Sequence, residues 1–72
     1  MWNIRLVDIG GDGLITEKVT PVDTLPECEV MAGLLCARHL GVQRVTLLHT
    51  EDLIYGVLVN GLEVGVVVIT IL

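Results

Sequence analysis

The chain has 72 residues and a net charge of −5 at pH 7, and 53% of its residues are apolar before its eight glycines are counted. Ordinary globular proteins reach roughly 45–50% with glycine included, so this composition excludes an intrinsically disordered chain. Nine acidic residues against four basic ones argue against a nucleic-acid-binding protein, which needs lysine and arginine to displace counterions from phosphates. The length indicates one small domain spanning residues 1–72.

The first predicted element is a β-hairpin. Trp2–Ile9 is short and rich in β-branched residues, and it ends at a glycine cluster at residues 10–13. Glycines supply the positive φ angles of a tight turn, and Leu14–Val22 follows as a second strand. The glycine cluster weakly resembles a phosphate-binding loop. Such a loop needs a helix behind it, however, and here a strand follows, so we expect a turn.

A helix is predicted over residues 25–40. Thr24 and Glu27 fit a capping box at its start, and Gly41 is a suitable residue just after its end. Val30 and Leu34 mark the apolar stripe that recurs at helical spacing. The side of the helix away from this stripe carries small residues rather than charged ones, so the helix is apolar nearly all round. Such a helix is usually buried on more than one side.

Three further strands are predicted over Gln43–Thr50, Leu53–Val59 and Leu62–Ile71. The last two flank Asn60-Gly61, the preferred dipeptide of a type I′ hairpin turn. The order β-β-α-β-β-β predicts an α+β domain. In it, a single helix packs on a roughly five-stranded, mainly antiparallel sheet.

The segment Val19-Thr20-Pro21-Val22-Asp23-Thr24-Leu25 leads from the predicted hairpin into the predicted helix. It resembles the corresponding segment of ubiquitin-like β-grasp domains, which also open with a hairpin, pass through a helix and return to strands. The resemblance covers about half of the chain. It implies a β-grasp-like sheet, while a meander-type sheet fits the same element order. The resemblance does not extend to a function.

The last two predicted strands are apolar on both faces, whereas a sheet with one solvated face should alternate apolar and polar residues. One helix about 10 Å across covers about half of one face of a sheet about 19 Å wide. We therefore expect a homodimer or larger symmetric assembly, joined through sheet faces or through the edge of the strand at residues 62–71. A monomer closed by its own loops and a complex with a different protein are the alternatives. The predicted interface residues are Tyr55, Val57, Val59, Val64, Val66 and Val68.

Cys28 and Cys36 are the only cysteines. Eight helical residues span about 12 Å, which is too far for a disulfide between them. Two buried free thiols suit a reducing cytoplasm. Arg5 and Asp8 interrupt the apolar start of the chain, which is not typical of a signal peptide, and no uncharged apolar run approaches the roughly 20 residues of a membrane helix. We expect a cytoplasmic protein without membrane contact.

The residues that could carry chemistry do not form a recognisable set. Cys36 and His39 lie three residues apart, but two ligands do not complete a zinc site, and nothing fixes an acid beside His39 for a cysteine nucleophile. Asp8 and Asp12 lack the spacing of a calcium loop. We therefore predict no catalytic residue, no cofactor and no metal, and a protein that is not an enzyme.

The acidic residues suggest where a partner binds. Glu27, Glu29, Glu51 and Asp52 form a predicted acidic recognition surface for a basic protein. We expect a non-catalytic, self-associating module that docks on a larger partner. Inhibitors, antitoxins and small anti-CRISPR proteins of mobile elements are similar in size and charge. The alternatives are a structural homo-oligomer, such as a phage or shell component, or an enzyme subunit whose interface site uses His39 or His49.

Overall fold

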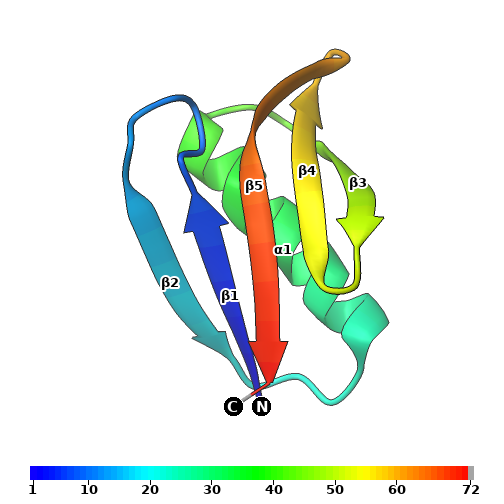
Figure 1. Cartoon of the computed structure of the whole chain (residues 1–72). Coiled ribbons are helices and arrows are strands. Elements are labelled where there is room, and N and C mark those ends of the chain that lie inside the picture. The colour runs from blue at the N-terminus through cyan, green and yellow to red at the C-terminus, as the bar shows by residue number, and fades with distance from the viewer. Residues whose placement is uncertain (72) are drawn as a thin grey trace.

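A computed structural model describes residues 1–71 as five strands and one helix. The elements are β1 (Trp2–Val7), β2 (Ile15–Thr20), α1 (Leu25–Leu40), β3 (Thr46–Glu51), β4 (Ile54–Val59) and β5 (Leu62–Ile71). The strands form one antiparallel sheet in the order β2-β1-β5-β4-β3, and α1 crosses one of its faces (Figure 1). This confirms the predicted α+β architecture. The three strands after the helix follow one another as a meander.

β5 lies inside the sheet, between β1 and β4. Its Val66 stands opposite Val7 of β1 on one side and Gly56 of β4 on the other. The prediction that copies join through the edge of this strand is therefore wrong, because both sides of β5 are already paired. The two outer strands of the sheet are β2 and β3.

The ends of the helix and the last hairpin follow local sequence signals. The side chain of Thr24 accepts a hydrogen bond from the backbone N–H of Glu27. At the other end Gly41 adopts a left-handed conformation with φ of 71°, and Val42 N–H donates to Ala37 O at 3.0 Å. Asn60-Gly61 has φ angles of 52° and 82°, as a type I′ turn requires. The predicted helix start at Thr24, the helix end at Gly41 and the type I′ turn are confirmed, and of the predicted capping box the structure shows the bond from Glu27 N–H to Thr24.

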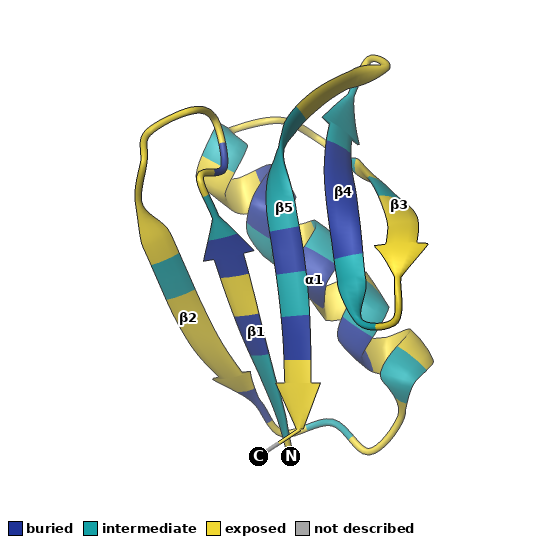
Figure 2. Ribbon diagram, in the orientation of Figure 1, coloured by how far each residue is buried: buried dark blue, intermediate teal, exposed yellow. Residues whose placement is uncertain are grey.

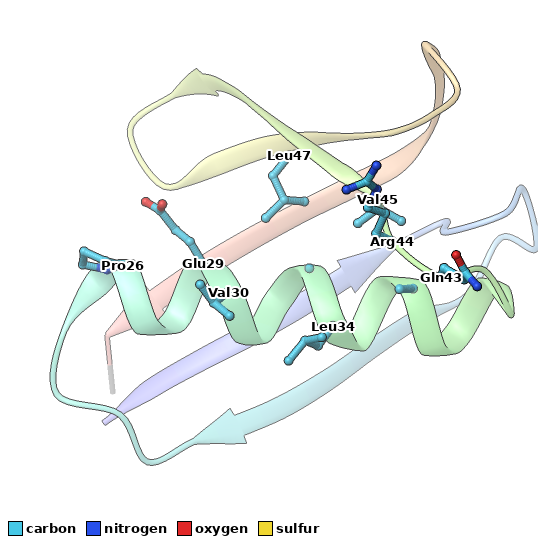
Figure 3. A pocket seen from close by; sticks show the side chains of 10 residues that line it. Pro26, Glu29, Val30, Leu34, Gln43, Arg44, Val45 and Leu47 are labelled. Atoms are coloured by element: carbon cyan, nitrogen blue, oxygen red, sulfur yellow. The ribbon is translucent and has the colours of Figure 1, made fainter.

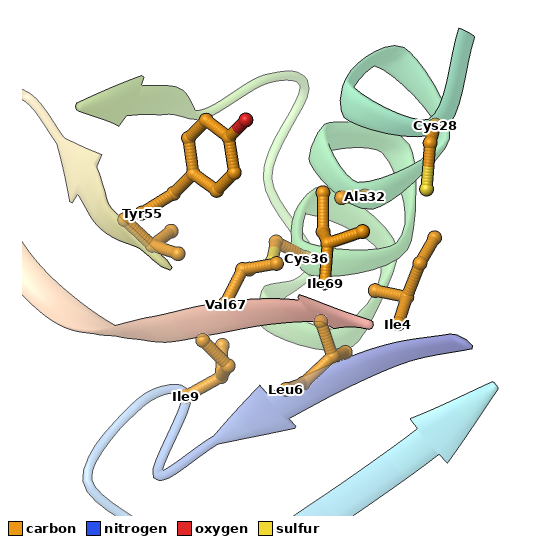
Figure 4. Close-up of a cluster of buried hydrophobic side chains, with 10 residues drawn as sticks. Ile4, Leu6, Ile9, Cys28, Ala32, Cys36, Tyr55, Val67 and Ile69 are labelled. Atoms are coloured by element: carbon orange, nitrogen blue, oxygen red, sulfur yellow. The ribbon is translucent and has the colours of Figure 1, made fainter. Parts of the chain in front are cut away.

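The core lies between α1 and the sheet (Figure 4). The sheet contributes large side chains that are fully or almost fully buried, and the helix contributes small ones at four-residue spacing. The sheet side includes Ile4, Leu6, Val57, Val67 and Ile69, and the helix side includes Cys28, Ala32 and Cys36. Small residues on the helix let its axis approach the bulky strands closely.

The helix therefore packs through the side opposite to its Val30–Leu34 stripe. Val30 is 66% exposed and Leu34 is 56% exposed, whereas Ala32 and Cys36 are completely buried. Had the stripe faced the sheet, its larger side chains would have met Ile4 and Ile69 and held the helix farther away. The apolar stripe that dominates the helix sequence is left at the surface.

The loop between β1 and β2 folds onto the start of β5. Asp8 N–H donates to Leu14 O at 2.8 Å, which closes the hairpin, and Gly10 N–H donates to Val64 O at 2.7 Å. Ile9 is 2% exposed and lies against Gly65. The loop thus seals one end of the core. Among residues 1–71, no helix is both long and apolar enough to cross a membrane.

Candidate interaction surfaces

In Figure 2 the helix lies behind the sheet, so the viewer faces the side of the sheet that α1 does not cover. The sequence and the strand registers give this side many apolar residues. Successive residues of a strand point to opposite faces, so the neighbours of the buried residues point away from the helix. The strand registers place these outward-pointing residues side by side. We call this surface the helix-free face, and its apolar members are Val7, Ile15, Val19, Leu48, Ile54, Leu58, Val66 and Val68.

The outer members of the helix-free face are the most exposed ones. Ile15 is 62% exposed, Val19 is 57% exposed and Leu48 is 54% exposed, whereas the members on the three inner strands are half-buried by their neighbours. The face also carries an ion pair between Arg5 Nε and Glu17 Oε1 at 2.7 Å. This pair lies between the apolar residues of β1 and β2, and apolar side chains make up most of the remaining face. A surface of this kind is typical of a protein interface.

The structure divides the six predicted interface residues. Val66 and Val68 lie on the helix-free face, while Val59 and Val64 are half-buried near the β4–β5 turn. Tyr55 and Val57 are buried against the helix and belong to the core, so these two residues are not available to a partner. β4 is apolar on both faces, so the sequence does not distinguish the face that packs on the helix from the face that is open.

The predicted acidic residues lie at one end of the molecule. Glu27 and Glu29 belong to the first turns of α1. Glu51 ends β3 and Asp52 follows it in the β3–β4 turn, which lies at the same end of the molecule (Figure 1). Tyr55 joins these two parts, because its hydroxyl donates to Glu29 Oε1 at 2.7 Å. We call this region the acidic end. It gives the molecule a strongly negative pole.

A second contact reinforces this connection between helix and turn. The ring of His49 stacks on the ring of Tyr55 with centroids 5.0 Å apart. His49 Nε2 also forms a hydrogen bond to the backbone carbonyl oxygen of Asp52. Burial, followed by the hydrogen bond to Glu29 and its negative charge, raises the pKa of Tyr55 to about 12. The phenol therefore stays protonated at neutral pH and acts as a hydrogen-bond donor rather than a base.

The pKa of Tyr55 is directly measurable because it is the only tyrosine. We expect its ultraviolet phenolate signal to titrate near pH 12 in the folded protein and near pH 10 after unfolding. The folded state holds the proton more tightly, so this group's stabilising contribution is complete below pH 10 and is lost as the pH rises toward 12. Glu29→Gln should lower the native midpoint while leaving it above 10, because burial remains. A native midpoint of 10, with circular dichroism still showing a folded chain, would contradict this assignment.

The cysteines, His39 and Asp12, which were the remaining candidates for chemistry, do not come together in one site. Burial raises the pKa of Cys36 to about 11, and burial with the charge of Glu29 raises the pKa of Cys28, so both free thiols are poor nucleophiles. His39 does not contact Cys36. Its Nε2 instead lies 3.0 Å from Asp12 Oδ2, and the Leu14 N–H and His39 hydrogen bonds lower the pKa of Asp12. Within residues 1–71, no group of three potential ligands forms a metal site.

An apolar groove runs between α1 and β3 (Figure 3). It has a volume of about 470 Å³. Val30, Gly33 and Leu34 line its helix side, and Val45 and Leu47 line its strand side. The sequence does not reveal this groove, because the hydrophobic pattern of the helix does not determine which of its sides faces the sheet. The spacing of Cys28, Ala32 and Cys36 was the available signal, since it marks a continuous stripe of small residues.

No protein-family model, no curated protein and no solved structure matches this chain. Its candidate surfaces are therefore judged from their own geometry and chemistry.

Proposed function

We propose that this chain is a small, non-catalytic protein-binding module that docks on a larger protein through its helix-free face. The observation that carries the proposal is the apolar character of that face, whose outer residues Ile15, Val19 and Leu48 are each more than half exposed. A standard interface buries about 800 Å² per partner, about a sixth of the 4645 Å² surface of this chain.

The charge distribution favours a basic partner. Glu27, Glu29, Glu51 and Asp52 create a negative pole beside the sheet, and the chain carries a net charge of −5. Opposite charges on a partner would speed the encounter and orient it, while apolar contacts would hold the complex. Such a module acts by occupying a functional surface of its target, as inhibitors, antitoxins and anti-CRISPR proteins do. The two free thiols are compatible with action in a reducing cytoplasm.

The test removes apolar surface from the helix-free face without touching the core. The double variant Ile15→Ser/Val19→Ser changes two exposed side chains of one outer strand. Leu62→Ser is the control, because Leu62 is 72% exposed and lies outside this face. Partners captured from a lysate by the parent chain are purified, and their affinities for all three proteins are then measured.

We expect the double variant to bind at least about tenfold more weakly and the control to bind like the parent chain. Raising the salt concentration should weaken the parent complex, and Glu27→Gln/Asp52→Asn should reduce this salt dependence. Equal affinity of the double variant and the parent would refute docking through the helix-free face. Salt-independent binding would refute the role of the acidic end.

A further inference from the structure

β3 presents an outer edge that carries little protection against pairing. Natural outer strands usually avoid pairing by means of charged residues, proline, bulges or a covering segment. β2, at the other edge, carries Glu17 and Lys18. From Thr46 to His49, β3 has no Lys, Arg, Asp, Glu or Pro, and its register against β4 shifts only between His49 and Glu51. The regular part of β3 is therefore open to one more strand.

The charges that flank β3 have opposite signs. Arg44 precedes the strand, and Glu51 and Asp52 lie at its end. If a second β3 pairs antiparallel around Leu48, or around the Leu47–Leu48 bond, the end of each strand that Arg44 precedes lies beside the end of the other strand that carries Glu51 and Asp52. A parallel arrangement would place Arg44 opposite Arg44. The strand is thus complementary in charge to a reversed copy of itself.

The groove between α1 and β3 lies alongside this edge. Val30 and Leu34 are 66% and 56% exposed on its helix side (Figure 3). Their exposure has no structural reason within a single chain, since the helix is anchored through its opposite side. A strand added to β3 would bring a second helix toward these two residues and cover them.

We infer that two copies of this chain pair through their β3 strands, antiparallel and around a twofold axis. The two sheets then join into one continuous sheet with both helices on the same side. Backbone hydrogen bonds extend the sheet, Val30 and Leu34 of the two copies approach each other, and two symmetric contacts form between Arg44 and the acidic β3–β4 turn. Pairing around a twofold axis requires a surface that is complementary to itself. The surface formed by β3 and the groove meets this requirement, because it is apolar in the middle and carries opposite charges at its two ends.

The helix-free face stays open in this dimer, because the second copy is added beside the sheet, at the edge of β3, and not on top of this face. The dimer doubles the width of that face. The dimer is tested at Leu34, Arg44 and Glu51, and docking through the helix-free face is tested at Ile15 and Val19, so either one can fail alone.

The first experiment measures mass by sedimentation equilibrium, from about one micromolar to several hundred micromolar. We expect a reversible monomer–dimer equilibrium. Leu34→Glu should weaken the dimer at least tenfold, since it places a charge in the apolar centre while changing only an exposed side chain. Leu62→Glu is the matched control and should leave the dimer unchanged. A mass of one chain at every concentration would overturn the inference.

The second experiment tests the antiparallel arrangement by exchanging charges. Arg44→Glu leaves both ends of β3 acidic, and Glu51→Lys makes its C-terminal end more basic, so each variant should dimerise several-fold more weakly than the parent chain. A mixture of Arg44→Glu and Glu51→Lys chains should form heterodimers in preference to homodimers, measured by native mass spectrometry. A statistical mixture would overturn the antiparallel pairing. A dimer that resists all three β3 and groove variants, but is lost in Ile15→Ser/Val19→Ser, would place the contact on the helix-free face instead.

Discussion

Replacing Gly65 by alanine should destabilise this protein by about 3 kcal/mol or more. A Cβ atom at this position would lie 2.5 Å from Ile9 Cδ1, 2.8 Å from Ile9 Cα and 3.1 Å from Asp8 O. Two of these three atoms belong to backbone, so rotating one side chain does not relieve the clash. The loop between β1 and β2 would have to leave β5, which breaks the hydrogen bond from Gly10 N–H to Val64 O and exposes Ile9.

The consequence is large because a domain of this length is expected to have a total stability of about 4–11 kcal/mol. Urea unfolding followed by circular dichroism measures the change. Gly33→Ala is the matched control, since a Cβ at Gly33 has no heavy atom within 4 Å. Alanine favours the helix, so this variant should gain about 0.5–1 kcal/mol. Equal stabilities of the Gly65→Ala variant and the parent chain would show that Ile9 does not pack on β5 as described.

The second large effect is expected at Ile69. This side chain is 1% exposed and lies in the core beneath α1, so Ile69→Ala should cost about 2–5 kcal/mol. Ile71→Ala provides the comparison, because the same residue type stands two positions later in β5 but is 69% exposed. That variant should change the free energy of unfolding by less than about 0.5 kcal/mol.

Both variants are to be unfolded in urea at low protein concentration, so that self-association does not contribute to the measured stability. The slope of free energy against urea should be similar for both, since neither substitution changes how much surface unfolding exposes. A cost at Ile71 as large as that at Ile69 would mean that a partner or a second copy covers the end of β5. Similar small costs at both positions would contradict the position of the core.

Local signals in the sequence correctly predicted the elements and their order. Thr24 and Gly41 bound the helix through hydrogen bonds to residues only a few positions away, and Asn60-Gly61 sets its turn through its own φ angles. These features depend on short-range sterics and hydrogen bonding, so they can be read without knowledge of the rest of the chain. The antiparallel pairs β1–β2, β3–β4 and β4–β5 join strands that are consecutive in the sequence, whereas the pairing of β1 with β5 joins the two ends of the chain and is a tertiary feature.

Predictions that depended on the choice of a face were less reliable. The Val30–Leu34 stripe and the small stripe through Ala32 both have helical spacing, and hydrophobicity alone favours the larger residues. β4 is apolar on both faces, so its sequence does not show that Tyr55 and Val57 face the helix rather than a partner. In each case, the size and shape of the opposing surface decided which side is buried, and those properties belong to the assembled fold.

By itself, the sequence determined the element order of this protein, its acidic charge and its excess of apolar surface. The tertiary structure alone decided where that surplus lies, namely on the helix-free face and on the Val30–Leu34 side of α1. It also decided that β3 rather than β5 is an outer strand. The physical reason is that strand order and helix orientation are fixed by close packing between segments distant in the sequence. Which apolar side of a helix or strand is buried depends on the shapes of the two segments that pack against each other.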